Sequence, residues 1–168
     1  NEDNPDFRSI NALADALQEP DERLLDAVSA VIDLDSFLTF WAMEIMVAHW
    51  DGYSGNTNNF HFYDDPTTRR LKFIPWGTDG TFQTPIMFFE ERRPAPRTIN
   101  AAGLLCRRLY LHPEGRQLYL DRLTSLIDSH WRIDVLEASI DEMVSVFADA
   151  VRADHLDEFY DNLSYVLD

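Results

Sequence analysis

A predicted β-hairpin with a polar loop on each side occupies the stretch His49–Phe82, HWDGYSGNTNNFHFYDDPTTRRLKFIPWGTDGTF. Aromatic and aliphatic residues separated by turn-forming residues predict the hairpin over 60–75. The first loop, 49–59, is rich in glycine and asparagine, so we expect it to contain no helix. The second loop, 76–82, follows the hairpin. Because antiparallel strands return the chain to its starting end, both loops are expected to face one site.

Oxygen-bearing side chains gather in these two loops. Asp51 precedes Asn56 by five residues, Asn59 stands directly before the first strand, and Asp79 lies in the second loop. Magnesium prefers one or two carboxylates with phosphate and water, and an asparagine carbonyl can complete such a set. The order of aspartate, asparagine, hairpin and aspartate therefore predicts a phosphoryl-transfer site. In it Asp51 orients the attacking hydroxyl, while Asp79 with Asn56 or Asn59 holds the metal; the choice between the asparagines stays open.

A structural role for the same residues is the competing interpretation. Asp and Asn followed by Gly and Ser are what any tight loop uses, and only their joint order with the hairpin favours chemistry. His49 and His61 are more typical of hydrogen-bonded structural histidines than of general bases. A transition-metal site built from His49, Asp51 and His61 lacks the close ligand spacing of known motifs.

Composition narrows the class of partner. The 168 residues include 30 acidic and 14 basic side chains, which gives a net charge of −16, and Lys72 is the sole lysine. This charge argues against a nucleic-acid partner and weakly favours basic protein substrates. No apolar run is long enough for a membrane span. The single cysteine, Cys106, stands among leucines of a predicted helix and is expected to be a buried thiol.

Apolar residues at helical spacing predict helices over most of the remaining chain. The third helix, capped by Asp33 or Asp35, is apolar on nearly every face and is expected to be the central buried one. We expect a mostly α fold with one short β-hairpin, in a single domain over 1–168. The predicted helices are 7–17, 20–32, 33–47, 99–111, 113–131, one from 134 and one after 154, the strands are 60–63 and 71–74, and 83–97 is expected to be extended and irregular.

About 35 residues of the chain resemble the CotH kinases, atypical secreted protein kinases first associated with bacterial spore coats. The resemblance is carried by HWDGYSGNTNNFHFYDDP and LKFIPWGTDGTF. It implies the carboxy-terminal lobe of an atypical Ser/Thr protein kinase that uses ATP with Mg²⁺ or Mn²⁺ and acts in an extracellular, cell-surface or spore-coat setting. The resemblance also implies that 49–59 is a catalytic loop with Asp51 as the catalytic aspartate, that 76–82 is a metal loop, and that 98–168 is a helical remainder. Asn56 or Asn59 and Asp79 match the cofactor-binding and metal-binding positions.

Two departures from the family pattern weaken that expectation. Many members carry two aspartates after the Pro-Trp pair, whereas Gly77 takes the first of those positions here. A kinase also needs an amino-terminal lobe with a phosphate-covering loop and a lysine, and Lys72 stands in the hairpin. The nucleotide would therefore need a further lobe, and residues 1–168 alone are expected to be inactive. The alternative is a non-catalytic coat or surface interaction module, with the Asp and Asn loops binding calcium; phosphate-ester hydrolysis would need more metal ligands.

Overall fold

The computed structural model describes residues 7–82 and 99–147. The chain forms two compact units, 1–124 and 125–168, which are described separately. The expectation of a single domain stays a prediction. Among the described residues, no helix is both long and apolar enough to cross a membrane.

Three helices open the first unit: α1 (Arg8–Ala16), α2 (Asp21–Val31) and α3 (Leu34–Met46). Pro20 precedes α2 with extended backbone, a favourable entry because a proline there gives up no helical hydrogen bond. Asp33 caps α3 by accepting a hydrogen bond from the Ser36 N–H at 3.2 Å, which settles the cap that the sequence left open. As expected, α3 is the buried helix; its buried residues are Phe37, Leu38, Phe40, Trp41, Ala42 and Glu44.

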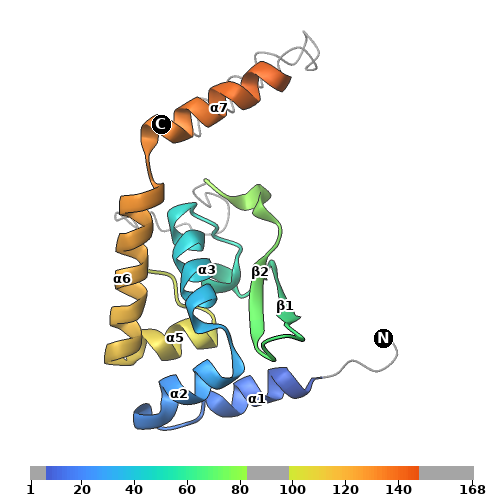
Figure 1. The fold of residues 1–168 in the computed structure, drawn as a ribbon, viewed down its shortest axis with the longest axis vertical. Coiled ribbons are helices and arrows are strands. Elements are labelled where there is room, and N and C mark those ends of the chain that lie inside the picture. Colours follow the sequence, from blue (N-terminus) through green and yellow to red (C-terminus); the bar gives the residue numbers. More distant parts are fainter. Residues whose placement is uncertain (1–6, 83–98, 148–168) are drawn as a thin grey trace, which may run out of the picture. The chain divides into compact units, whose positions relative to one another are not determined.

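The hairpin pairs β1 (Phe60–Asp64) with β2 (Leu71–Pro75) in antiparallel register, with Phe62 opposite Phe73. β2 lies against α3, as Figure 1 shows. Phe73 is the centre of an aromatic cluster, with ring centroids 4.7 Å from Phe37 and 5.0 Å from Tyr53. Such tilted and edge-on pairs add about 0.5–1.5 kcal/mol each beyond area burial. The hairpin is therefore held to α3 mainly by packing.

The far end of the hairpin is tied to the helices. Asp33 N–H donates to the Leu71 carbonyl at 3.0 Å, and Lys72 Nζ lies 3.2 Å from an Asp65 carboxylate oxygen and 3.7 Å from one of Asp33. Ser9 donates a hydrogen bond to Asp64. These contacts leave the opposite end, where the two loops lie, as the end that is free for a site.

Trp41 organises the other side of α3. Its ring is fully buried and stacks on Tyr119 with centroids 3.8 Å apart, and its Nε1 donates to the Asn100 carbonyl at 2.8 Å. Tyr119 belongs to α6 (Pro113–His130), which follows α5 (Leu104–Leu111). Cys106 of α5 is buried, as predicted. α3 is thus enclosed by the hairpin on one side and by aromatic contacts from α6 on the other.

The second unit contains, in its described part, the end of α6 and α7 (Ile133–Phe147). Arg132 pairs with Asp134 in the first turn of α7 at 2.6 Å. The negative charge of an acidic residue in the first turn also interacts favourably with the positive end of the helix dipole.

The expected fold class is confirmed, since the described chain is mostly helical with one antiparallel hairpin. One local prediction was wrong: the first loop contains a short helix, α4 (Tyr53–Asn56). The helix predicted over 99–111 begins later, because the chain around Gly103 is extended. The irregular segment 83–97 and the last predicted helix lie outside the described residues.

Candidate functional site

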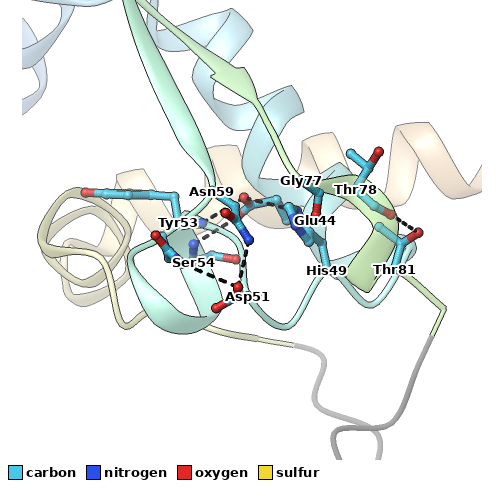
Figure 2. A network of polar contacts seen from close by, with 10 residues as sticks. Glu44, His49, Asp51, Tyr53, Ser54, Asn59, Gly77, Thr78 and Thr81 are labelled. Carbon is cyan, nitrogen blue, oxygen red and sulfur yellow. Dashed lines mark hydrogen bonds and ion pairs between the residues drawn. The ribbon is translucent and has the colours of Figure 1, made fainter.

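Asp51 stands at the centre of the first loop, where asparagine amides hold its carboxylate. Asn56 donates to Oδ1 at 2.7 Å, and Asn59 donates to Oδ2 at 2.7 Å. Asn58 Nδ2 donates a longer hydrogen bond, of 3.3 Å, to the same Oδ2. Figure 2 shows the Asn59 side chain directed at Asp51. Because the amide nitrogens face Asp51, the amide oxygens of these asparagines remain available to other partners.

The loop reaches this conformation through α4. Thr57, which follows α4, has a φ of 57°, and Asn59 has a φ of 46°, so two residues have left-handed backbone before β1 begins. Asparagine tolerates this region better than most residues because its short polar side chain bonds locally. The helical turn and these two residues bring three asparagine side chains back over Asp51.

Glu44 of α3 holds the start of α4 from beneath. Its Oε1 accepts the Tyr53 N–H at 2.9 Å and its Oε2 accepts the Ser54 N–H at 2.8 Å. These are first-turn amides, which have no partner within their own helix. Only 3% of Glu44 is exposed. The carboxylate of Glu44 therefore acts as a helix cap supplied from a distant element.

Burial raises the pKa of Glu44, while the hydrogen bonds from Ser54 and Tyr53 and the charge of a protonated His49 act in the opposite direction. The two backbone hydrogen bonds hold the carboxylate, because their donor positions are fixed by the chain. The Ser54 Oγ is buried without a hydrogen-bond partner among the described residues.

His49 connects the first loop to the second. Its Nε2 lies 3.2 Å from the Gly77 carbonyl and its Nδ1 lies 3.7 Å from Glu44 Oε1. A carbonyl can only accept, so Nε2 carries the hydrogen. Figure 2 shows His49 between Glu44 and Gly77. His49 is 2% exposed, and its burial and its contact with Gly77 are consistent with the structural role predicted for it.

Further contacts fix the second loop beside the first. Trp76 N–H donates to the Asn59 carbonyl at 3.0 Å, and Phe82 N–H donates to the Val47 carbonyl at 2.7 Å. Gly77 has a φ of 60°, and a Cβ placed there would lie 2.8 Å from Asn59 Cγ. The two loops therefore meet at Asn59 and Gly77, as the hairpin predicted.

Asp79 lies in the short 3₁₀ turn Thr78–Gly80 of the second loop and is exposed. Within residues 7–82 and 99–147 it makes no hydrogen bond or ion pair, so the structure does not join it to Asp51. In that same part of the chain, no three His, Cys, Asp or Glu side chains cluster as metal ligands, which leaves the His49, Asp51 and His61 alternative without support. Asp79 and the asparagine amides do carry hard oxygen donors, the ligand type that magnesium prefers beside phosphate and water.

An open cavity of about 700 Å³ lies between α3 and the second loop. Glu44 and His49 contribute polar groups to its wall, and the rest of the lining is mostly apolar. The lining residues are Ser36, Thr39, Phe40, Met43, Glu44, Val47, His49, Phe73, Pro75, Thr78, Thr81 and Phe82.

The structure brings together Asp51, Asn56 and Asn59 of the predicted site, and it adds two residues that the sequence reasoning missed. Glu44 is one, although a carboxylate among the apolar residues in the second half of α3 was a signal that could have found it. Tyr53 is the other: its hydroxyl accepts the Leu105 N–H at 3.1 Å and joins α4 to α5. No spacing in the sequence indicates that contact.

The fold and the site thus define a mostly helical protein with a carboxylate–amide site at the end of a hairpin. The chain belongs to the CotH kinase protein family, whose family model matches residues 1–161. It is also similar to the protein named Invasin CotH3 of Rhizopus delemar, with 30% identity over 80 residues. That match covers 45% of this chain and 13% of the relative. The relative is fungal, so it gives no support to the bacterial spore-coat setting expected from the sequence.

Proposed function

We propose that the full-length protein carrying this chain transfers the γ-phosphoryl group of ATP to Ser or Thr hydroxyls of a protein substrate. The observation that carries the proposal is the Asp51 carboxylate, fixed by Asn56 and Asn59 at the end of a hairpin in a CotH family chain. A carboxylate held in one orientation can accept a hydrogen bond from the attacking hydroxyl and align its oxygen with the phosphorus. Asp51 is the proposed catalytic residue.

Asp79 with Asn59 or Asn56 is the proposed set that would hold Mg²⁺ or Mn²⁺ bound to ATP. Asn59 is favoured by its contact with Gly77, since it alone of the two asparagines touches the second loop in the contacts described. A bound metal ion neutralises developing charge on the phosphate oxygens. The chain's own residues contribute the position of the hydroxyl and the oxygen donors. The rest of the nucleotide site is proposed to come from a further lobe.

The protein substrate is proposed to be basic and to be met outside the cell or at its surface. The net charge of −16 attracts basic partners, and the similar protein from Rhizopus delemar is named an invasin. Residues 1–168 by themselves are proposed to be inactive.

The test measures the transfer of the radiolabelled γ-phosphoryl group of ATP to a basic acceptor protein. It compares the full-length protein with its Asp51→Asn variant. We expect a loss of at least roughly 100-fold in kcat, because the neutral amide no longer accepts the hydroxyl proton. Asp26→Asn is the matched control, since Asp26 is exposed on α2 and makes no contact with either loop in the described chain. Equal activity of Asp51→Asn and Asp26→Asn would refute the role of Asp51.

A calcium-binding interaction module is the second candidate. It is favoured by Gly77, which supplies no carboxylate at a position where the family pattern often has one. Calorimetry of the full-length protein separates the candidates. Binding of ATP with Mg²⁺ supports the kinase, whereas Ca²⁺ binding without nucleotide binding supports the module.

A further inference from the structure

Glu44 contacts both the first loop and the histidine that reaches the second. It accepts two backbone hydrogen bonds, from Tyr53 and Ser54, and it lies 3.7 Å from His49 Nδ1. His49 Nε2 then contacts the Gly77 carbonyl at 3.2 Å. A continuous chain of polar contacts therefore runs from the helical turn after Asp51 to the start of the second loop.

The packing leaves Glu44 little freedom. A Cβ at Gly52 would lie 2.2 Å from Glu44 Oε1 and 2.8 Å from His49 Nδ1, so a side chain other than glycine at 52 would displace both groups. Gly52 has a φ of −79°, which alanine adopts without strain, so only the space beside Glu44 demands glycine there. Glu44, His49 and the backbone at 52 therefore leave no space between them for a side chain.

We infer that Glu44 is a positioning residue, which holds the Asp51 loop and, through His49, the Asp79 loop in the relative arrangement that transfer requires. This inference rests on the proposed function. Glu44 lies beneath α4 and acts through the backbone of the loop rather than on substrate. A shift of about 1 Å in a catalytic group can reduce a rate by roughly 10²-fold, so even a small relaxation of α4 is costly to chemistry.

The experiment compares wild type, Glu44→Gln and Gly52→Ala in the full-length protein. Glutamine offers one oxygen acceptor and turns an amide NH₂ toward the second backbone N–H, so one of the two hydrogen bonds is lost. We expect kcat to fall by about 10–100-fold while KM for ATP changes by less than about threefold. Gly52→Ala keeps the carboxylate and displaces it, and we expect the same pattern. It tests the inference independently where Glu44→Gln does not fold.

A matched control separates positioning from general destabilisation. Val28 is fully buried in α2, outside both loops, and Val28→Ala lowers stability by removing core contacts. At an assay temperature where all variants are folded, we expect Val28→Ala to keep kcat within about twofold. A kcat retained within threefold by both Glu44→Gln and Gly52→Ala overturns the inference, as does an equal loss in Val28→Ala.

Amide hydrogen exchange gives a readout that does not depend on activity. We expect Glu44→Gln to accelerate exchange at Tyr53 and Ser54, and also at Phe82, whose N–H bonds to the Val47 carbonyl. Faster exchange confined to Tyr53 and Ser54 shows a local helix cap and overturns the coupling of the loops. If the wild type transfers no phosphate, the proposed function fails, while the exchange at Phe82 still decides whether Glu44 couples the two loops.

Discussion

Replacing Tyr53 by phenylalanine tests how the first loop is attached to α5. The Tyr53 hydroxyl accepts the Leu105 N–H at 3.1 Å, and Leu105 stands in the first turn of α5 with no exposed surface. First-turn amides lack a partner inside their own helix, so the phenol serves as a cap. Phenylalanine keeps the ring, whose contacts with Phe60 and Phe73 have centroid distances of 4.8 Å and 5.0 Å.

The expected magnitude follows from the single group that is removed. A buried donor left without an acceptor costs about 1–3 kcal/mol, and the phenyl ring recovers part of this because no hydroxyl has to be dehydrated. We expect Tyr53→Phe to lower the free energy of unfolding by about 1.5 kcal/mol. Burial also raises the pKa of the Tyr53 phenol, so the lost group is a neutral hydroxyl at physiological pH.

The assay is equilibrium urea unfolding of the full-length protein, followed by tryptophan fluorescence. Tyr63→Phe is the control, because Tyr63 is 47% exposed on β1 and its hydroxyl has no hydrogen-bond partner in the described chain. We expect the control to change stability by less than about 0.5 kcal/mol. If Tyr53→Phe is as neutral as Tyr63→Phe, with an unchanged dependence on urea, the hydroxyl does not cap α5 and the reasoning is wrong.

Three other substitutions test the same region by similar unfolding measurements. Gly103→Ala places a Cβ 2.4 Å from the Tyr53 ring, so we expect a loss of about 1–3 kcal/mol; a neutral result would contradict this close contact. Gly77→Ala combines a φ of 60° with a Cβ 2.8 Å from Asn59, and we expect a loss of roughly 1–2 kcal/mol, which unchanged stability would disprove. Glu44→Gln tests how the pKa of Glu44 makes the stability of the protein depend on pH. Because burial places the folded-state pKa of Glu44 above the unfolded value near 4.5, the wild type should lose stability relative to Glu44→Gln as pH rises from 4.5 through the folded-state pKa. The neighbouring imidazole and the Tyr53 phenol are present in both proteins, and a stability difference independent of pH across this window would rule out the raised pKa.

The elements whose signals are local could be predicted from the sequence. The alternation of aromatic residues and the turn after Asp64 specify the hairpin, and the observed strands extend the predicted ones by one residue each. The apolar residues on all faces of 33–47 specify a buried helix, and Trp41 and Phe37 are indeed core residues. The meeting of the two loops follows from antiparallel pairing alone.

The elements that depend on distant partners could not be predicted in the same way. Gly52 and Gly55 indicated a loop without helix, yet α4 forms because Glu44 supplies acceptors for its first amides. Local propensity was overridden by a tertiary contact, which is the usual reason for such an error. The start of α5 was misplaced similarly, since the Tyr53 hydroxyl caps it near Leu105.

The same tertiary contact connects the folding of the loop to its proposed chemistry. A buried carboxylate is unfavourable unless its oxygens are hydrogen-bonded, and the Tyr53 and Ser54 amides of α4 supply those hydrogen bonds. Formation of α4 and burial of Glu44 therefore stabilise each other, and neither is favourable alone. Asp51 lies two residues before this turn, so its orientation depends on a carboxylate that is not expected to touch substrate. A search for site residues limited to the two loops would miss Glu44, whereas a search for unexplained charges in apolar helices would find it.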